Sequence, residues 1–216
     1  MGDIGKVVSV NVGRPRPLTI KGRERETGIF KEPQAGCVPI AGVTVGDDVQ
    51  MDTKHHGGTY QAVYAYSAED YAWWSGELGV ELAPGTFGEN ITTEGLDLAA
   101  ALIGERWKVG SAVIEVSDPR IPCSTLAARM RQLEVPAFAK RFAAARRFGP
   151  YFLIYEEGDV AAGDTIEVIH RPNHDITHTD IADLALRMDP ARAEEVAAVF
   201  PRPEQRARWL DFVRQS

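Results

Sequence analysis

The amino-acid sequence predicts a mainly β protein with helices, in which a β-barrel is followed by a three-helix C-terminal extension. Up to about residue 171, short β-branched runs alternate with Gly, Pro and Asp, a pattern typical of barrels and closed sheets. After His170 the pattern changes to a polar, Pro-containing link and then to segments with helical spacing and no strand-like run. We therefore expect a barrel domain over residues 1–171 and a helical extension over residues 172–216.

Six stretches of the first part carry the strand pattern of β-branched and aromatic residues. These are residues 6–12, 42–45, 61–66, 112–117, 151–155 and 164–170. Glycine, proline and aspartate separate them, so each run ends in a turn. This spacing favours a barrel or another closed sheet.

Helical patterns interrupt the strand series at three places. In residues 67–78, Ser67 and Asp70 form a capping-box-like start, and Gly79 supplies the stop. The other two helical patterns are residues 123–133 and 136–148, which carry apolar side chains at helical spacing.

The extension is predicted to contain helices that start near Asp180, Pro190 and Pro203, since proline fits the first position of a helix. Its apolar positions are enough to cover one face of the barrel, and we expect that use rather than a groove for a partner. They are Ile181, Leu184, Ala185, Met188, Val196, Val199, Phe200, Trp209, Leu210 and Val213.

Composition and charge limit the classes of partner. The chain has 216 residues, and 24 Lys and Arg stand against 31 Asp and Glu, for a formal net charge of −7. This balance argues against a broad basic surface for duplex nucleic acid. No apolar run approaches the ~20 residues of a membrane-spanning helix, and the N-terminus lacks the pattern of a secretory signal. We expect a cytoplasmic protein that binds neither duplex nucleic acid nor a membrane.

Two cysteines, Cys37 and Cys123, are too few for a four-thiolate zinc or iron–sulfur site. In a reducing compartment we do not expect them to form a structural disulfide. Cys37 lies in a strand-like stretch, and we expect it to be a structural residue. The common signatures of dinucleotide, P-loop, zinc-protease and serine-hydrolase sites are absent from the sequence.

Three short polar clusters lie at turns between apolar runs. In the first, residues 52–58, Lys54 adds positive charge and two glycines after His56 let backbone amides approach a ligand, although a plain glycine turn explains it equally well. In the second, residues 85–93, the Asn90 amide and hydroxyls such as that of Thr92 could bind anionic oxygen, although a turn is the simpler explanation.

The third cluster, residues 117–125, runs from a strand into a helix. Because Cys123 lies at the positive end of that helix and Arg120 is close in sequence, both are expected to lower the pKa of the thiol. A thiolate is a soft metal ligand and a good nucleophile. The same helix start, with Ser124 and Thr125, offers amides and hydroxyls to a phosphate. A small buried cysteine at a helix start is the alternative.

Taken in order, K-H-H-G-G at residues 54–58, F-G-E-N-I at 87–91 and P-R-I-P-C at 119–123 resemble the motifs of the MOSC domain family. This family includes the C-terminal module of molybdenum cofactor sulfurases and the core of the mitochondrial amidoxime-reducing components. The resemblance covers nearly the whole chain and is closest to the stand-alone, YiiM-like bacterial branch. Animal-type reductases carry F-R-P-N-I at the second motif, so their pterin contacts do not transfer directly to Gly88 and Glu89.

The resemblance implies a MOSC-type β-barrel that binds a molybdenum cofactor, with Cys123 as the catalytic residue and the ligand of the molybdenum. It implies a further set of cofactor-binding residues: Lys54, His56, Asn90, Thr92, Arg120 and Ser124. Lys54 and Arg120 suit the phosphate of the molybdopterin, and Asn90 and His56 suit the pterin or the substrate. Because a labile pterin can be lost during purification, an empty site is consistent with the same assignment.

The expected activity is the reduction of an N-hydroxylated base or a related N-oxygenated small molecule. The sequence lacks the cysteine-rich ferredoxin domain of some relatives, so electrons are expected from a separate flavoprotein or reductase.

Other functions stay open. Cys123 could carry sulfur as a persulfide for metal–sulfur cluster or cofactor assembly, although no aminotransferase-like domain is present to mobilise it. The barrel could store or deliver the cofactor without catalysis. A cysteine hydrolase with His56 as base lacks a clear orienting acid. Trp73 and Trp74 suit the core, the wall of the site or a homodimer contact equally well.

Overall fold

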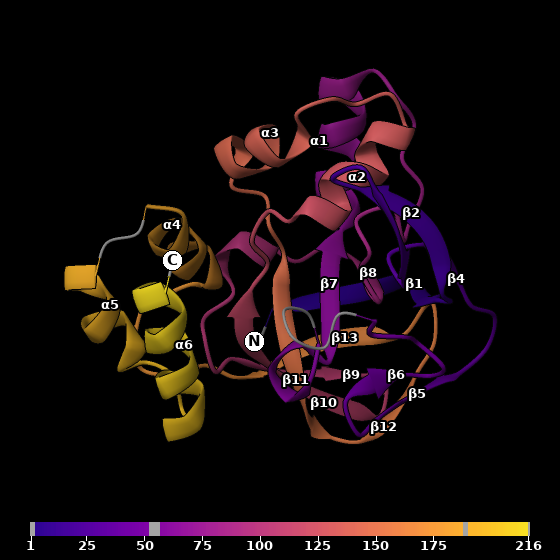
Figure 1. Cartoon of the computed structure of the whole chain (residues 1–216). Helices are drawn as coiled ribbons and strands as arrows, with labels where there is room; N and C mark the ends of the chain where they lie inside the picture. Colours follow the sequence, from indigo (N-terminus) through magenta and orange to yellow (C-terminus); the bar gives the residue numbers. More distant parts are fainter. Residues whose placement is uncertain (1–2, 52–56, 188–189, 216) are drawn as a thin grey trace.

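The computed structural model describes residues 3–51, 57–187 and 190–215, and within these ranges seven strands close into a barrel (Figure 1). The strand order is β13, β9, β10, β11, β7, β8 and β1, and β1 pairs again with β13 to complete the circle. Only β7 and β8 run parallel; the other barrel pairs are antiparallel. The barrel strands are β1 (Ile4–Gly13), β7 (Val63–Ser67), β8 (Ile91–Glu94), β9 (Arg106–Val109), β10 (Ala112–Pro119), β11 (Pro150–Glu156) and β13 (Thr165–His170). The closed sheet predicted from the sequence is confirmed.

Smaller elements surround the barrel. The strand β4 (Lys31–Pro33) pairs with the end of β1, and β2 (Arg16–Ile20) forms a hairpin with β3 (Arg23–Thr27) that packs beside α2. A further sheet contains β5 (Val38–Ala41), β6 (Thr44–Val45) and β12 (Gly158–Val160), and two short 3-10 helices are η1 (Thr59–Gln61) and η2 (Leu98–Ala100). The predicted strand at 42–45 is shorter because Gly42, at φ +60°, lies in the turn that joins β5 to β6.

The three predicted internal helices are present as α1 (Ala68–Leu78), α2 (Ser124–Gln132) and α3 (Phe138–Ala145). The Ser67 hydroxyl accepts a hydrogen bond from the Asp70 amide at 3.0 Å, and α1 ends at the left-handed Gly79. The helix α3 is shorter than expected because Ala137 and Arg146, on either side of it, have positive φ and cannot continue a helix.

Aromatic side chains join α1 and α3 to the barrel. Trp74 is buried and lies 4.9 Å from the Phe138 ring, whereas the Trp73 ring lies under the Arg147 guanidinium at 4.5 Å. Trp74 is therefore a core residue. Neither tryptophan lines the large cavity described below.

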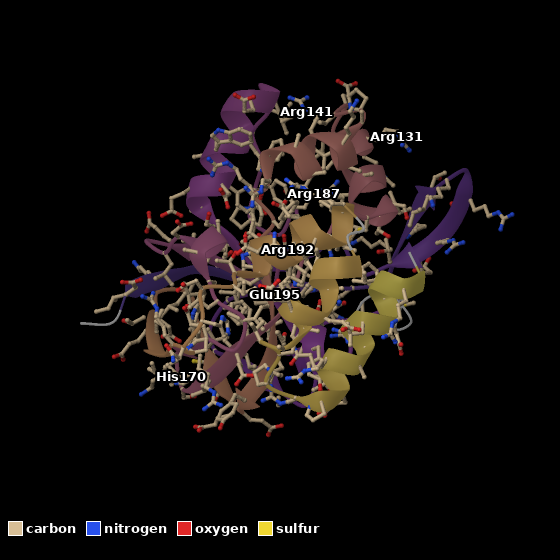
Figure 2. The ribbon with its side chains drawn as sticks, turned by 90° about the vertical axis from the view of Figure 1, so that its left-hand side faces the viewer. Arg131, Arg141, His170, Arg187, Arg192 and Glu195 are labelled. Carbon is tan, nitrogen blue, oxygen red and sulfur yellow. The ribbon has the colours of Figure 1, made fainter. Side chains whose placement is uncertain are left out.

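In the described residues after 170, the extension forms three helices, as predicted: α4 (His178–Arg187), α5 (Pro190–Ala197) and α6 (Pro203–Gln215). They cover one side of the barrel (Figures 1 and 2). Apolar side chains of all three helices belong to the same hydrophobic core as the barrel strands: Ile181, Leu184, Ala185, Ala193, Val196, Ala197, Trp209 and Val213. The extension thus packs on the barrel face, as expected, although Met188 lies outside the described residues. The boundary between residues 171 and 172 stays a prediction.

None of the helices in the described ranges has the length and hydropathy that a membrane span requires.

Candidate functional site

A cavity of about 840 Å³ opens beside the start of α2. The β2–β3 hairpin, the segment around Asp48, Arg120 just after β10 and the first turn of α2 contribute to its walls. The predicted site residues Asn90, Arg120, Cys123 and Ser124 all line it. The structure therefore brings together parts of the second and third polar clusters.

The strand β10 ends at Pro119, and Cys123, four positions later, is the N-cap residue of α2. The Cys123 Sγ accepts hydrogen bonds from the Leu126 amide at 3.4 Å and from Arg120 Nη2 at 3.5 Å. Both donors, together with the positive end of the helix dipole, favour a negatively charged sulfur. The side chain is partly buried and borders the cavity, so a ligand can reach it.

Arg120 is held among aromatic rings rather than in solvent. Its side chain is buried, its Nη1 donates to the Tyr151 hydroxyl, and its guanidinium lies 5.2 Å from the Tyr64 ring centre. Burial by itself lowers the pKa of Arg120, but the interactions with Tyr151 and Cys123 outweigh it and raise the pKa above its usual value. The guanidinium is permanently charged and holds the cysteine in place.

One hydrogen-bond donor of Arg120, its Nε, is not satisfied by the described part of the protein. Its Nε is buried and has no hydrogen-bond partner in the part of the chain that the structure describes. An unsatisfied buried donor on a charged group costs free energy, about 1–3 kcal/mol, and a bound acceptor would remove that cost. Because Arg120 lines the cavity, a ligand there could supply the missing acceptor.

Asn90 lines the cavity, but its amide is already used by the fold. Its Nδ2 donates to Asp48 Oδ2 at 2.9 Å and to the Asn11 carbonyl at 3.4 Å, and its Oδ1 accepts from the Tyr64 amide at 3.2 Å. Asn90 thus orients the acidic side chain beside it. The amide that the sequence offers to a ligand is not available in this arrangement.

Lys31 is a cavity residue that sequence reasoning missed. Its ammonium is buried against Asp48, whose other oxygen accepts from the Gly13 amide at 2.7 Å. Burial lowers the pKa of Lys31, while the Asp48 charge opposes this shift. Lys31 lies in a three-residue strand, and its approach to Asp48 depends on how β4 pairs with β1, so no local motif indicates it.

Thr92 does not line the cavity, contrary to the expectation from the second cluster. It lies behind the cavity, where its hydroxyl donates to Glu89 Oε1 at 2.8 Å and accepts from Ser9 and Asn11 at 3.1 Å each. Burial raises the pKa of Glu89, and its hydrogen bonds from Gly85 and Tyr71 partly oppose that. This buried network shapes the turn before β8 and does not contact the cavity.

Lys54 and His56, predicted from the first cluster, lie outside the described residues. Gly57, the first described residue after them, lines the cavity at φ +104°. Its amide donates to Gln61 Oε1 at 3.1 Å, and a Cβ at this position would lie 2.2 Å from Gln50 Oε1. Only glycine fits here, which explains why the motif carries a glycine directly after the histidines.

The remaining cavity residues include Ser124 and Thr125 in the first turn of α2 and a group of hairpin residues: Lys21, Arg23, Arg25 and Glu26. Cys37, expected to be structural, is exposed just before β5. Among the described residues, no group of three or more His, Cys, Asp and Glu could hold a metal ion. A metal bound at Cys123 would therefore take its other ligands from a cofactor or from residues outside these ranges.

A closed barrel that presents a helix-capping cysteine to a cavity lined by cations defines a class of β-barrel domains with a thiol-bearing site. Residues 52–167 match the model of the MOSC domain, and the chain belongs to this family.

Three relatives support this placement. The chain is 36% identical over 165 residues to the uncharacterized protein YflK of Bacillus subtilis, which covers 76% of the chain and 73% of YflK. It is 31% identical over 172 residues to a protein of Gibberella moniliformis named "Reductase", which covers 78% of the chain and 30% of that protein. The crystal structure of YiiM from Geobacillus stearothermophilus superposes with a TM-score of 0.74 at 26% identity, covering 97% of the chain and 99% of YiiM. The fold is thus MOSC-type and YiiM-like.

Proposed function

We propose that this protein is an oxidoreductase that binds a molybdenum cofactor and reduces N-hydroxylated bases or related N-oxygenated small molecules. The observation that carries the proposal is the placement of Cys123, a helix-capping sulfur with two N–H donors at the border of a large cavity. MOSC family membership and the similarity to a protein named reductase favour the same class.

The residues present fit such a cofactor. The cavity, at about 840 Å³, lies within the range of roughly 300–1,000 Å³ usual for ligand and cofactor sites. A soft thiolate, a buried guanidinium and an unpartnered Nε match a metal with anionic ligands around it. When bound, the cofactor supplies two-electron redox chemistry at its metal. Cys123 would hold the metal, and Arg120 would fix the position of Cys123.

Tyr151 gives the cavity a neutral polar group. Burial raises the pKa of Tyr151, while the Arg120 charge opposes that shift, so the hydroxyl keeps its proton at neutral pH. Tyr151 and Tyr64 also cover the Arg120 guanidinium and keep water from it. In the proposal this hydroxyl orients a bound substrate through a hydrogen bond.

The overall reaction consumes two electrons and two protons and converts an N–OH group to N–H and water. A separate flavoprotein or reductase would deliver the electrons. These partners belong to the proposal, as does the identity of the substrate.

The test is the metal and pterin content of protein produced together with the molybdopterin pathway and purified without oxygen. We expect near-stoichiometric molybdenum in the wild type and in the matched control Cys37→Ala, because Cys37 lies outside the cavity. We expect Cys123→Ala to lose it. Equal molybdenum in Cys123→Ala and the wild type would refute the assignment of Cys123. A wild type without molybdenum, under conditions that load a reductase of this family, would refute the cofactor.

The same position of Cys123 supports a second candidate, a persulfide carrier, since a stabilised sulfur beside Arg120 also suits sulfur transfer. Peptide mass spectrometry separates the two candidates. A carrier would show about 32 Da added to the Cys123 peptide, and reductant would remove it. A non-catalytic cofactor-binding module would instead load molybdenum and turn over none of the N-hydroxylated substrates tested.

A further inference from the structure

The β2–β3 hairpin directs two arginines toward the cavity. In an antiparallel pair, directly opposite residues lie on the same face of the hairpin. Arg25 is opposite Leu18, and Arg23 is opposite Ile20. Leu18 and Ile20 are buried, so this face packs against the protein. Arg23 and Arg25 accordingly line the cavity from the hairpin side, although their own side chains stay exposed.

The cavity carries an excess of positive charge in an acidic protein. Among the residues that the structure describes, its lining contains five cationic residues, Lys21, Arg23, Arg25, Lys31 and Arg120, against the carboxylates of Glu26 and Asp48. The chain as a whole has a net charge of −7. Like charges gathered in one cavity repel each other, and an anionic ligand relieves that repulsion.

These cations differ in whether they have a partner within the protein. Lys31 is paired with Asp48, and Arg120 contacts Tyr151 and Cys123. Within residues 3–51, 57–187 and 190–215, no ion pair or side-chain hydrogen bond joins Arg23 or Arg25 to another group. The hairpin arginines can therefore give all their donors to a ligand.

The start of α2 adds neutral donors to the same wall. Ser124 and Thr125 line the cavity in the first turn of this nine-residue helix, which has no acidic residue there. Its amides and dipole favour an anion. An independent sign of a ligand is Arg120 Nε, which is buried and unpartnered in the described ranges on a side chain that lines this cavity.

We propose that Arg23 and Arg25, together with the first turn of α2, form a subsite for a phosphate monoester. The phosphate lies between the hairpin and the first turn of α2, and the rest of the ligand occupies the cavity beside Cys123. This inference builds on the proposed function for the identity of the ligand. It assigns the phosphate to the hairpin rather than to Arg120, to which the family resemblance assigned it, because Arg120 Nη1 and Nη2 already contact Tyr151 and Cys123. The unpartnered Arg120 Nε is then left for the part of the ligand beside Cys123.

The experiment uses cofactor-free full-length protein, with inorganic phosphate and phenyl phosphate as probes in calorimetric titrations at low ionic strength. Arg23→Gln/Arg25→Gln removes the two guanidinium groups, and we expect it to weaken phosphate binding about tenfold or more. Arg131→Gln is the matched control. Arg131 is exposed in the last turn of α2 (Figure 2). It is not among the residues that line the cavity, so this variant should bind phosphate as the wild type does.

Arg23→Lys/Arg25→Lys keeps the charge and should recover part of the affinity, and added salt should weaken the wild type most. Because both arginines are exposed, the variants should keep the wild-type melting temperature. Wild-type affinity in the double glutamine variant, or no saturable phosphate binding by the wild type, would overturn the subsite.

Pterin content after production with the molybdopterin pathway identifies the source of the phosphate. Loss of pterin from Arg23→Gln/Arg25→Gln assigns the subsite to the cofactor, and full pterin with weak phosphate binding assigns it to a phosphorylated substrate. If the wild type lacks molybdenum but shows arginine-dependent phosphate binding, the proposed function fails and the subsite stands.

Discussion

The junction between the barrel and the extension contains a buried histidine that should make stability depend on pH. His178 is the first residue of α4, and its side chain is fully buried. Its Nε2 lies 2.7 Å from the Leu98 carbonyl, so this nitrogen is assigned the proton. Its Nδ1 has no partner within the described residues. A second proton would therefore have to enter an apolar site without an acceptor.

The sign and size of the effect follow from this burial. Burial lowers the pKa of His178 from 6.5 to about 4, while the Leu98 carbonyl and the charges of Asp180 and Asp97 oppose the shift. Between these values the unfolded chain binds a proton that the folded protein does not, so stability falls as the pH falls from 6.5 to 4. From pH 7 to pH 4.5 this residue alone should remove about 2 kcal/mol of unfolding free energy.

His178→Gln tests this value, because a glutamine amide can donate to the Leu98 carbonyl and does not titrate. Urea unfolding of both proteins at pH 7 and pH 4.5 gives the loss for each, and the wild type should lose about 2 kcal/mol more than the variant. Carboxylates such as Glu89 and Asp118 titrate in both proteins and cancel in the comparison. An equal loss of unfolding free energy in the two proteins would show that burial does not lower the pKa of His178.

Two further predictions concern buried carboxylates. Asp118 Oδ2 accepts from Gln61 Nε2 at 3.1 Å and from Arg208, so Asp118→Ala should cost about 2 kcal/mol in urea unfolding at pH 7. Asp118→Asn, which keeps an oxygen for Gln61, should cost less, and an unchanged alanine variant would contradict the role of this bridge to α6. Because burial raises the pKa of Glu89, its stabilising effect is present at low pH and is lost as the pH rises through the folded value. The melting temperature of Glu89→Gln relative to the wild type should therefore be higher at pH 8 than at pH 5, and a constant difference would argue against a raised pKa.

Local signals predicted the helices and the ends of α1, whereas α3 is shorter than predicted at both ends. Ser67 and Gly79 cap the two ends of α1 through contacts with residues three or four positions away in the sequence. The position of Cys123 at the start of α2 follows in the same way, because Pro119 and Pro122 separate the strand-like stretch from the apolar helical spacing that begins after Cys123. Features that depend only on residues close in the sequence can therefore be predicted without the tertiary structure.

The partners of the site residues depend on long-range pairing and could not be predicted. Asn90 and Asp48 are 42 residues apart, and Lys31 and Asp48 are 17 apart, yet they form one buried cluster. The sequence shows that Asn90 has an amide, but the register of β1 against β8 decides that this amide contacts Asn11. The sequence likewise shows that Thr92 has a hydroxyl, but only the fold shows that this hydroxyl donates to the buried Glu89.

The hairpin was missed because its charges alternate in sign, a pattern typical of an exposed surface strand. Arg23 and Arg25 alternate with Glu24 and Glu26, which nearly cancels their charge in any count along the sequence. Folding changes this balance, because Arg23, Arg25 and Glu26 line the cavity whereas Glu24 does not, and the two arginines lie opposite the buried Leu18 and Ile20. A positive cavity can thus arise in a chain of negative net charge without any basic run.

The cations of the cavity then fall into two kinds with different consequences. Arg120 is enclosed by rings and bonded to the sulfur, so it acts on Cys123 and has little freedom to follow a ligand. Arg23 and Arg25 lie on an exposed hairpin, so they can adjust to an incoming anion. Because a preorganised group loses less entropy on binding, the structure combines a fixed Cys123 sulfur at the start of α2 with exposed hairpin arginines that line the same cavity. Substitutions of Arg23 and Arg25 should therefore change the affinity for a ligand. Substitutions of Arg120 should change the reactivity and metal binding of the Cys123 sulfur.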